Sequence, residues 1–90
     1  MKVIQINAAE FSTPQEVQEY LMEALSFPDY YGGNLDSLYD GLTEVDEKIK
    51  IIVSNKIADE ENLGEYGERL LAVFETAVQD NDNLELEITE

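Results

Sequence analysis

Two aspartates, Asp36 and Asp40, are the residues whose type and spacing best suit a chemical role. They stand four residues apart, which is about one turn of a helix. They lie in the stretch 28–42, where Tyr30 and Tyr31 precede two glycines and the acids follow. No basic residue lies between residues 3 and 47, so nothing close in the sequence neutralises the two carboxylates. The pair therefore predicts a surface that attracts a strongly positive partner.

The same carboxylates could instead be the acid and base of a small hydrolase, because glycosidases use such a pair. The chain, however, has no histidine and no cysteine, and it lacks both a nucleophile elbow and a phosphate-binding loop. A chain of 90 residues also rarely encloses a deep substrate pocket. A hydrolase using Asp36 and Asp40 stays as the last alternative, and the prediction is that the chain is not an enzyme.

A second acidic run, Asp80–Asn83, has the composition of a calcium-binding loop. An EF-hand, however, would need an oxygen ligand where Leu84 stands and a glycine where Glu85 stands. We interpret this run as a turn. The sequence predicts no metal site and no cofactor.

Composition restricts the classes of partner. The formal charge is −16, from 21 acidic and 5 basic residues, so binding to nucleic acid phosphates or to an anionic membrane is not expected. The chain has no cysteine, which excludes disulfides and favours a reducing compartment, so we expect a cytoplasmic protein. It shows neither a signal-peptide pattern nor an apolar run of about 18 residues. Its length predicts a single domain over residues 1–90.

The elements that must position the acids are predicted from periodicity. Residues 1–6 are expected to form a strand. Thr13 is expected to cap a helix that has Pro14 in its first position, with Glu16 completing a capping box and Pro28 ending the helix. The core stripe of this helix has helical spacing and contains Val17, Tyr20, Leu21, Ala24 and Leu25.

The second half of the chain alternates strands with helices. The apolar run Ile49–Ser54 predicts a strand covered on both faces. Residues 57–63 predict a short helical turn, residues 66–81 a longer helix, and residues 84–89 a half-exposed strand. The order of elements predicts an α/β fold with a small three-stranded parallel β-sheet flanked by helices.

The acidic helix itself is expected to begin at Asn34, a good N-cap, and to bury a stripe of leucines with Tyr39 at its boundary. On a helix, Asp36 and Asp40 lie about 40° apart and away from that stripe. Such like charges repel each other slightly. Beside the tyrosines they favour a binding surface, although an ordinary solvated helix face stays open as the alternative.

These residues resemble a known family. Three short motifs, Tyr30-Tyr31-Gly32, Asn34-Leu35-Asp36 and Leu38-Tyr39-Asp40, look like the signature of the barstar family, intracellular inhibitors of the secreted ribonuclease barnase. The resemblance extends to the length, the element order and the stretch 73–77, so it covers essentially the whole chain. The family fold, a three-stranded parallel sheet flanked by helices, matches the predicted order.

The resemblance implies a plug for a ribonuclease active site. The helix Asn34 to Thr43 and the preceding loop would enter the substrate groove of the enzyme, with Asp40 in place of a substrate phosphate. Asp36 would pair with a groove arginine, and Tyr30 would pack on the catalytic histidine. The implied partner is a basic extracellular-type ribonuclease, bound one to one by a monomer. The implied contact residues are Tyr30, Gly32, Asn34, Leu35, Asp36, Tyr39, Asp40, Thr43 and Glu44, with Tyr31, Val45 and Thr76 added at the edge.

Four positions depart from the family pattern. Tyr39 and Val45 stand where barstar has tryptophans, Thr76 stands where it has a glutamate, and Glu44 stands where it has a glycine. These changes keep the inhibitory surface but point to a ribonuclease with different outer contacts. A further interpretation is an acidic mimic of nucleic acid that binds another basic protein or toxin, which would need neither Tyr30 nor the glycine turn.

Overall fold

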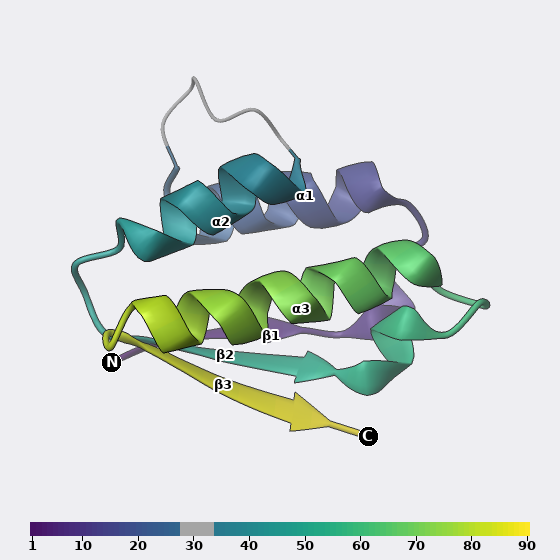
Figure 1. Cartoon of the computed structure of the whole chain (residues 1–90). Coiled ribbons are helices and arrows are strands. Elements are labelled where there is room, and N and C mark those ends of the chain that lie inside the picture. Colours follow the sequence, from purple (N-terminus) through teal and green to yellow (C-terminus); the bar gives the residue numbers. More distant parts are fainter. Residues whose placement is uncertain (28–33) are drawn as a thin grey trace.

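A computed structural model of the chain describes residues 1–27 and 34–90 (Figure 1). Three parallel strands form one sheet in the order β1-β2-β3. The strands are β1 (Lys2–Ile6), β2 (Ile49–Ser54) and β3 (Leu84–Thr89). The α-helices are α1 (Pro14–Ala24), α2 (Leu35–Thr43) and α3 (Glu65–Asp80), and two short 3-10 helices are η1 (Ala8–Glu10) and η2 (Asn55–Ala58). The predicted α/β fold with a three-stranded parallel sheet is confirmed.

All three α-helices lie on the same side of the sheet in Figure 1. Burial along β2 agrees, because buried residues alternate with half-buried ones and only one face carries the core. The prediction that β2 is covered on both faces is therefore wrong. On the uncovered face Lys50 forms an ion pair with Glu87 at 3.2 Å, and Val3 is 56% exposed. The continuous apolar run of β2 concealed this alternation, because Ile52 is apolar but lies on the uncovered face.

Helix α1 begins as its sequence predicts. The Thr13 hydroxyl accepts a hydrogen bond from the backbone N–H of Glu16 at 3.3 Å. In return, the Glu16 carboxylate accepts one from the backbone N–H of Thr13 at 3.0 Å, which completes the capping box. Hydrogen bonds from Ser12 hold the pKa of Glu16 below its usual value. Residues Val17 and Leu21 of this helix are fully buried in the core.

The end of α1 differs from the prediction. The helix ends at Ala24, before Pro28, because Ser26 adopts a left-handed φ of 56°. The backbone N–H of Ser26 bonds to Glu23 O at 3.2 Å, and that of Phe27 bonds to Met22 O at 3.0 Å. These two bonds form a Schellman motif, in which the chain reverses without needing a proline.

Two glycines allow close packing of the helices. At Gly41 in α2, an added Cβ would lie 2.6 Å from Cζ of Phe27, so the missing side chain admits the aromatic ring. At Gly67 in α3, an added Cβ would lie 2.0 Å from the carbonyl oxygen of Ile57, which belongs to η2. The short helical turn predicted for residues 57–63 is displaced: η2 spans Asn55–Ala58 and overlaps the prediction only at residues 57 and 58.

Candidate functional site

The two aspartates lie on the exposed side of α2, whose opposite side is fixed in the core. Leu38 and Leu42 are fully buried, whereas Asp36 and Asp40 are exposed. The Asn34 side chain accepts a hydrogen bond from the backbone N–H of Ser37 at 2.8 Å, so the predicted N-cap is confirmed. The helix therefore holds both carboxylates toward solvent on a rigid support.

A groove of about 470 Å³ runs between α2 and α3 next to these carboxylates. Apolar side chains from both helices line it, and the two aspartates and a threonine stand along it. The lining residues are Leu35, Asp36, Tyr39, Asp40, Ala72, Val73 and Thr76. The fold thus brings Thr76 from α3 together with the predicted contact residues of α2. An apolar groove with acidic edges suits a long basic side chain, because its stem can pack on carbon while its charged end meets a carboxylate.

Tyr39 is fixed by a partner that the sequence did not indicate. Its ring is half-buried, as predicted, and its hydroxyl donates a hydrogen bond to the Oδ2 atom of Asp80 at the end of α3. This hydrogen bond is the main reason why the pKa of Tyr39 is raised, followed by partial burial and by the charges of Asp80 and Asp40. A tyrosine phenol is already neutral at physiological pH, and the raised pKa extends the pH range over which it can donate to Asp80.

Other predicted contact residues lie at the carboxyl-terminal end of α2, outside this groove. The Thr43 hydroxyl donates to the backbone oxygen of Asp40 at 2.9 Å. Glu44 is the exposed C-cap residue, and Val45 packs against the core. These three residues therefore extend the α2 surface along its axis. The predicted residues Tyr30, Tyr31 and Gly32 lie outside the described part of the chain.

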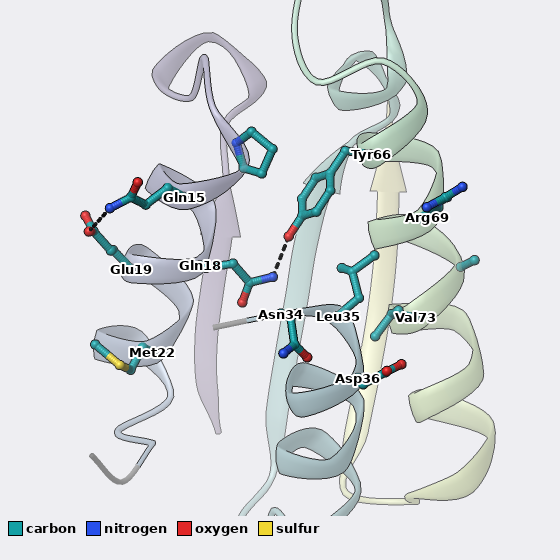
Figure 2. A pocket seen from close by; sticks show the side chains of 12 residues that line it. Gln15, Gln18, Glu19, Met22, Asn34, Leu35, Asp36, Tyr66, Arg69 and Val73 are labelled. Carbon is teal, nitrogen blue, oxygen red and sulfur yellow. Dashed lines mark hydrogen bonds between the residues drawn. The ribbon is translucent and has the colours of Figure 1, made fainter. Parts of the chain in front are cut away.

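A second cavity, of about 840 Å³, adjoins the amino-terminal end of α2 (Figure 2). It lies between α1 and α3, and the Gln18 amide donates a hydrogen bond to the Tyr66 hydroxyl across it. Asp36 lines it, and so does Arg69, a basic residue from a distant part of the sequence. Arg69, however, is paired with Glu65 at 2.8 Å.

Of the α3 residues that line the two cavities or bond to α2, sequence reasoning named only Thr76 as a contact residue and missed the other four. Arg69, Ala72, Val73, Thr76 and Asp80 recur at intervals of three or four residues, so they share one side of the helix. This second stripe beside the core stripe was the available signal. It was hidden because its members differ in chemical type.

Within residues 1–27 and 34–90, no group of three or more acidic, histidine or cysteine side chains could hold a metal ion. Of the run Asp80–Asn83, which was predicted to be a turn, Asp80 ends α3 and residues 81–83 form the turn that leads to β3. Among the helices of the described part, none is long and apolar enough to cross a membrane.

Comparisons with known proteins agree with this geometry. The family model described as "Barstar (barnase inhibitor)" matches residues 1–89. A protein of Bacillus subtilis (strain 168) named "Putative ribonuclease inhibitor YrdF" is 35% identical over 81 residues, which cover 89% of this chain and 89% of that protein. The similarity thus spans the sheet, all three α-helices and the groove between α2 and α3.

Proposed function

This chain belongs to the barstar family of ribonuclease inhibitors, and we propose that it blocks a barnase-like ribonuclease by filling the substrate groove with α2 and residues 28–33. Barstar-family proteins are inhibitors without catalytic activity, so the prediction that the chain is not an enzyme is confirmed. Because family members typically act inside the cell and this chain has no cysteine, we place its action in the cytoplasm.

The observation that carries the proposal is the presentation of Asp36 and Asp40 on the exposed side of a helix whose other side is buried. A ribonuclease groove is built to hold phosphates with arginine, lysine and histidine side chains. A carboxylate that accepts charge-assisted hydrogen bonds from such groups can occupy the place of a phosphate. Asp40, next to the α2/α3 groove, takes the central position, and Asp36 binds a neighbouring arginine.

The remaining contacts surround this pair. Tyr39 offers a half-buried ring beside Asp40, and Thr76 adds a contact from α3. Thr43 and Glu44 extend the surface past the end of α2. The full proposed contact set is Tyr30, Gly32, Asn34, Leu35, Asp36, Tyr39, Asp40, Thr43 and Glu44, with Tyr31, Val45 and Thr76 at the edge.

The net charge of the whole chain also favours association with a basic ribonuclease. A protein with a formal charge of −16 attracts a basic ribonuclease over a long range and accelerates association. Added salt screens this attraction between exposed charges. The rate constant for association should therefore fall as ionic strength rises, while the dissociation rate changes less.

The first prediction is that Asp40→Ala weakens binding to the partner ribonuclease by about 2–5 kcal/mol, because it leaves the basic groups of the groove unpaired. Isothermal titration calorimetry with barnase-like ribonucleases, together with an RNA-cleavage assay, measures this loss. Glu85→Ala is the matched control, because it removes the same charge from an exposed position on β3. It should change affinity only slightly.

Two results would count against the proposal. One is that no barnase-like ribonuclease binds at low salt and micromolar concentration. The other is that Asp40→Ala and Glu85→Ala weaken binding equally, which would indicate a diffuse acidic mimic of nucleic acid rather than a plug with a defined tip.

A further inference from the structure

The turn that follows α3 reaches back to α2 and holds its carboxyl-terminal end. Asn81 is only 8% exposed, and its side-chain amide donates to the backbone oxygens of Leu42 and Val45, at 2.9 Å each. The amide of Asn83 also donates to Val45 O at 3.2 Å. Asn81 is itself held, because its side-chain oxygen accepts from the backbone N–H of Asn83 at 3.0 Å.

We call the hydrogen bonds from the side-chain amides of Asn81 and Asn83 to the end of α2 the clasp. Asp80 immediately precedes the clasp and is the last residue of α3. Its backbone position is therefore fixed from both sides, by the helix before it and by the clasp after it. From this position its carboxylate accepts the hydrogen bond from the Tyr39 hydroxyl. The contact spans 41 residues of sequence and joins the middle of α2 to the end of α3.

We propose that Asp80 is a positioning residue of the inhibitory surface, which holds the Tyr39 ring beside Asp40 in its binding orientation before the ribonuclease arrives. This inference rests on the proposed function, because it concerns the same surface. Without this bond the exposed part of the half-buried Tyr39 side chain would be less ordered, and its ordering on binding would oppose association. Asp80 removes that cost from the binding step by ordering the ring in the uncomplexed inhibitor.

The arrangement also determines what Tyr39 can offer a partner. Its hydroxyl proton is already donated to Asp80, so the ring face and edge remain for contact with the ribonuclease. An aromatic face suits an arginine guanidinium or an imidazolium, both of which a ribonuclease groove supplies. The bound Asp80 carboxylate adds negative charge near that ring and strengthens the attraction for such a cation.

The second prediction concerns the hydrogen bond between Tyr39 and Asp80, which we call the tether. Asp80→Ala removes its acceptor and leaves a methyl group, and Tyr39→Phe removes its donor and leaves the aromatic ring. Each should weaken binding to the ribonuclease about two- to tenfold, the cost of ordering one side chain at an interface. The double variant should be no weaker than the weaker single variant, because both remove the same bond. Titration calorimetry on the full chain measures all three affinities.

Two further variants separate the tether from simple charge. Asp82→Ala removes one negative charge from an exposed position in the same turn and should leave affinity nearly unchanged. Asp80→Asn keeps an oxygen that can accept from Tyr39 but removes the charge, so it should retain most of the affinity that Asp80→Ala loses. If Asp80→Ala and Asp82→Ala behave alike, or if the losses of Tyr39→Phe and Asp80→Ala add, the inference is overturned.

A spectroscopic measurement tests the tether without a partner. In ultraviolet titrations of the uncomplexed protein, Tyr39 should ionise with a pKa above the usual value for a tyrosine, and Asp80→Ala should lower that pKa. Within residues 1–27 and 34–90, the charged groups that act on Tyr39 are Asp80 and Asp40, and Asp40→Asn should lower that pKa less, because the charge of Asp40 is the smallest cause. An unchanged titration in Asp80→Ala would overturn the tether.

Failure of the inference and failure of the proposed function are distinguishable. If Asp40→Ala does not weaken binding, the phosphate-mimic function fails whatever Asp80 does. If Asp40→Ala weakens binding strongly but Asp80→Ala does not, only the positioning role of Asp80 fails. Circular dichroism of each variant shows whether the fold is retained.

Discussion

The two ends of α3 make contacts of opposite kinds. At its amino-terminal end, Gly67 packs so closely on the backbone of η2 that a Cβ atom would lie 2.0 Å from Ile57 O. From its middle to its carboxyl-terminal end, α3 meets α2 across an open groove, through the hydrogen bond that Asp80 accepts from Tyr39, and through the bonds that Asn81 donates just after the helix. The contact at Gly67 leaves no space for a side chain at that position. The groove between α2 and α3 leaves space for a side chain of a partner protein.

The difference assigns two roles to one helix: the amino-terminal part of α3 contributes to stability, and the part beside α2 contributes to recognition of a partner. A backbone-to-backbone contact cannot adapt, so it fixes where α3 lies on the sheet. Polar side-chain contacts fix the orientation of α2 while leaving its acidic side and the groove accessible. The binding surface is therefore held in a defined orientation, and the groove beside it is left open rather than filled by core side chains.

The largest effect on stability is expected for Gly67→Ala. The new methyl group would overlap Ile57 O and approach Ala58 Cα to 2.8 Å, and both are backbone atoms that cannot rotate away. We expect a loss of about 3 kcal/mol in the free energy of unfolding, the upper range for overpacking. Urea denaturation followed by circular dichroism measures it.

For the folded fraction of Gly67→Ala, affinity for the ribonuclease should stay close to that of the parent chain, because the α3 residues that line the groove, Ala72, Val73 and Thr76, begin more than one helical turn beyond Gly67. A large loss of affinity with little loss of stability would contradict the division between the two ends.

Asn81→Ala should have the next largest effect, and it should affect both properties. It removes the two hydrogen bonds from the Asn81 amide to the backbone oxygens of Leu42 and Val45, at a cost of about 0.5–1.5 kcal/mol for each bond. It also loosens the end of α2, so binding to the ribonuclease should weaken as well. Denaturation and calorimetry on the same variant test the two losses.

Asn83→Ala serves as the graded comparison, because it removes one bond to Val45 O rather than two bonds. Stability should fall less than in Asn81→Ala. Equal stability of Asn81→Ala and the parent chain would show that the clasp does not hold α2.

The sequence predicted the local parts of this design and missed the long-range ones. The capping box at Thr13, the N-cap at Asn34 and the buried leucines of α2 follow from spacing within one or two turns, so periodicity was sufficient. The bond between Tyr39 and Asp80 spans 41 residues, and that between Asn81 and Leu42 spans 39. No local pattern encodes such pairs, and the run Asp80–Asn83 was interpreted only as a turn.

The sequence did not predict that one face of β2 is uncovered, and the reason is related. A run of apolar residues does not show which of them face helices, and here the helices cover one side only. Of the proposed contact residues, Asn34, Leu35, Asp36, Tyr39, Asp40 and Thr76 adjoin the two cavities beside α2. Their contact with a ribonuclease, like that of Tyr30, Tyr31 and Gly32, stays a prediction.

The smallest effect is expected for Gly41→Ala, which repeats the Gly67 substitution on the adaptable side of the comparison. The new methyl group would approach Cζ of Phe27, the far end of a half-buried side chain that can rotate or shift. Alanine is also favoured over glycine inside a helix by about 0.5–1 kcal/mol, which offsets that displacement. We therefore expect the free energy of unfolding to stay within about 1 kcal/mol of the parent value. Urea denaturation of Gly41→Ala and Gly67→Ala side by side tests this. If both variants lose the same stability, the Phe27 ring is held as rigidly as the Ile57 backbone, and α2 is no more adaptable than the η2 junction.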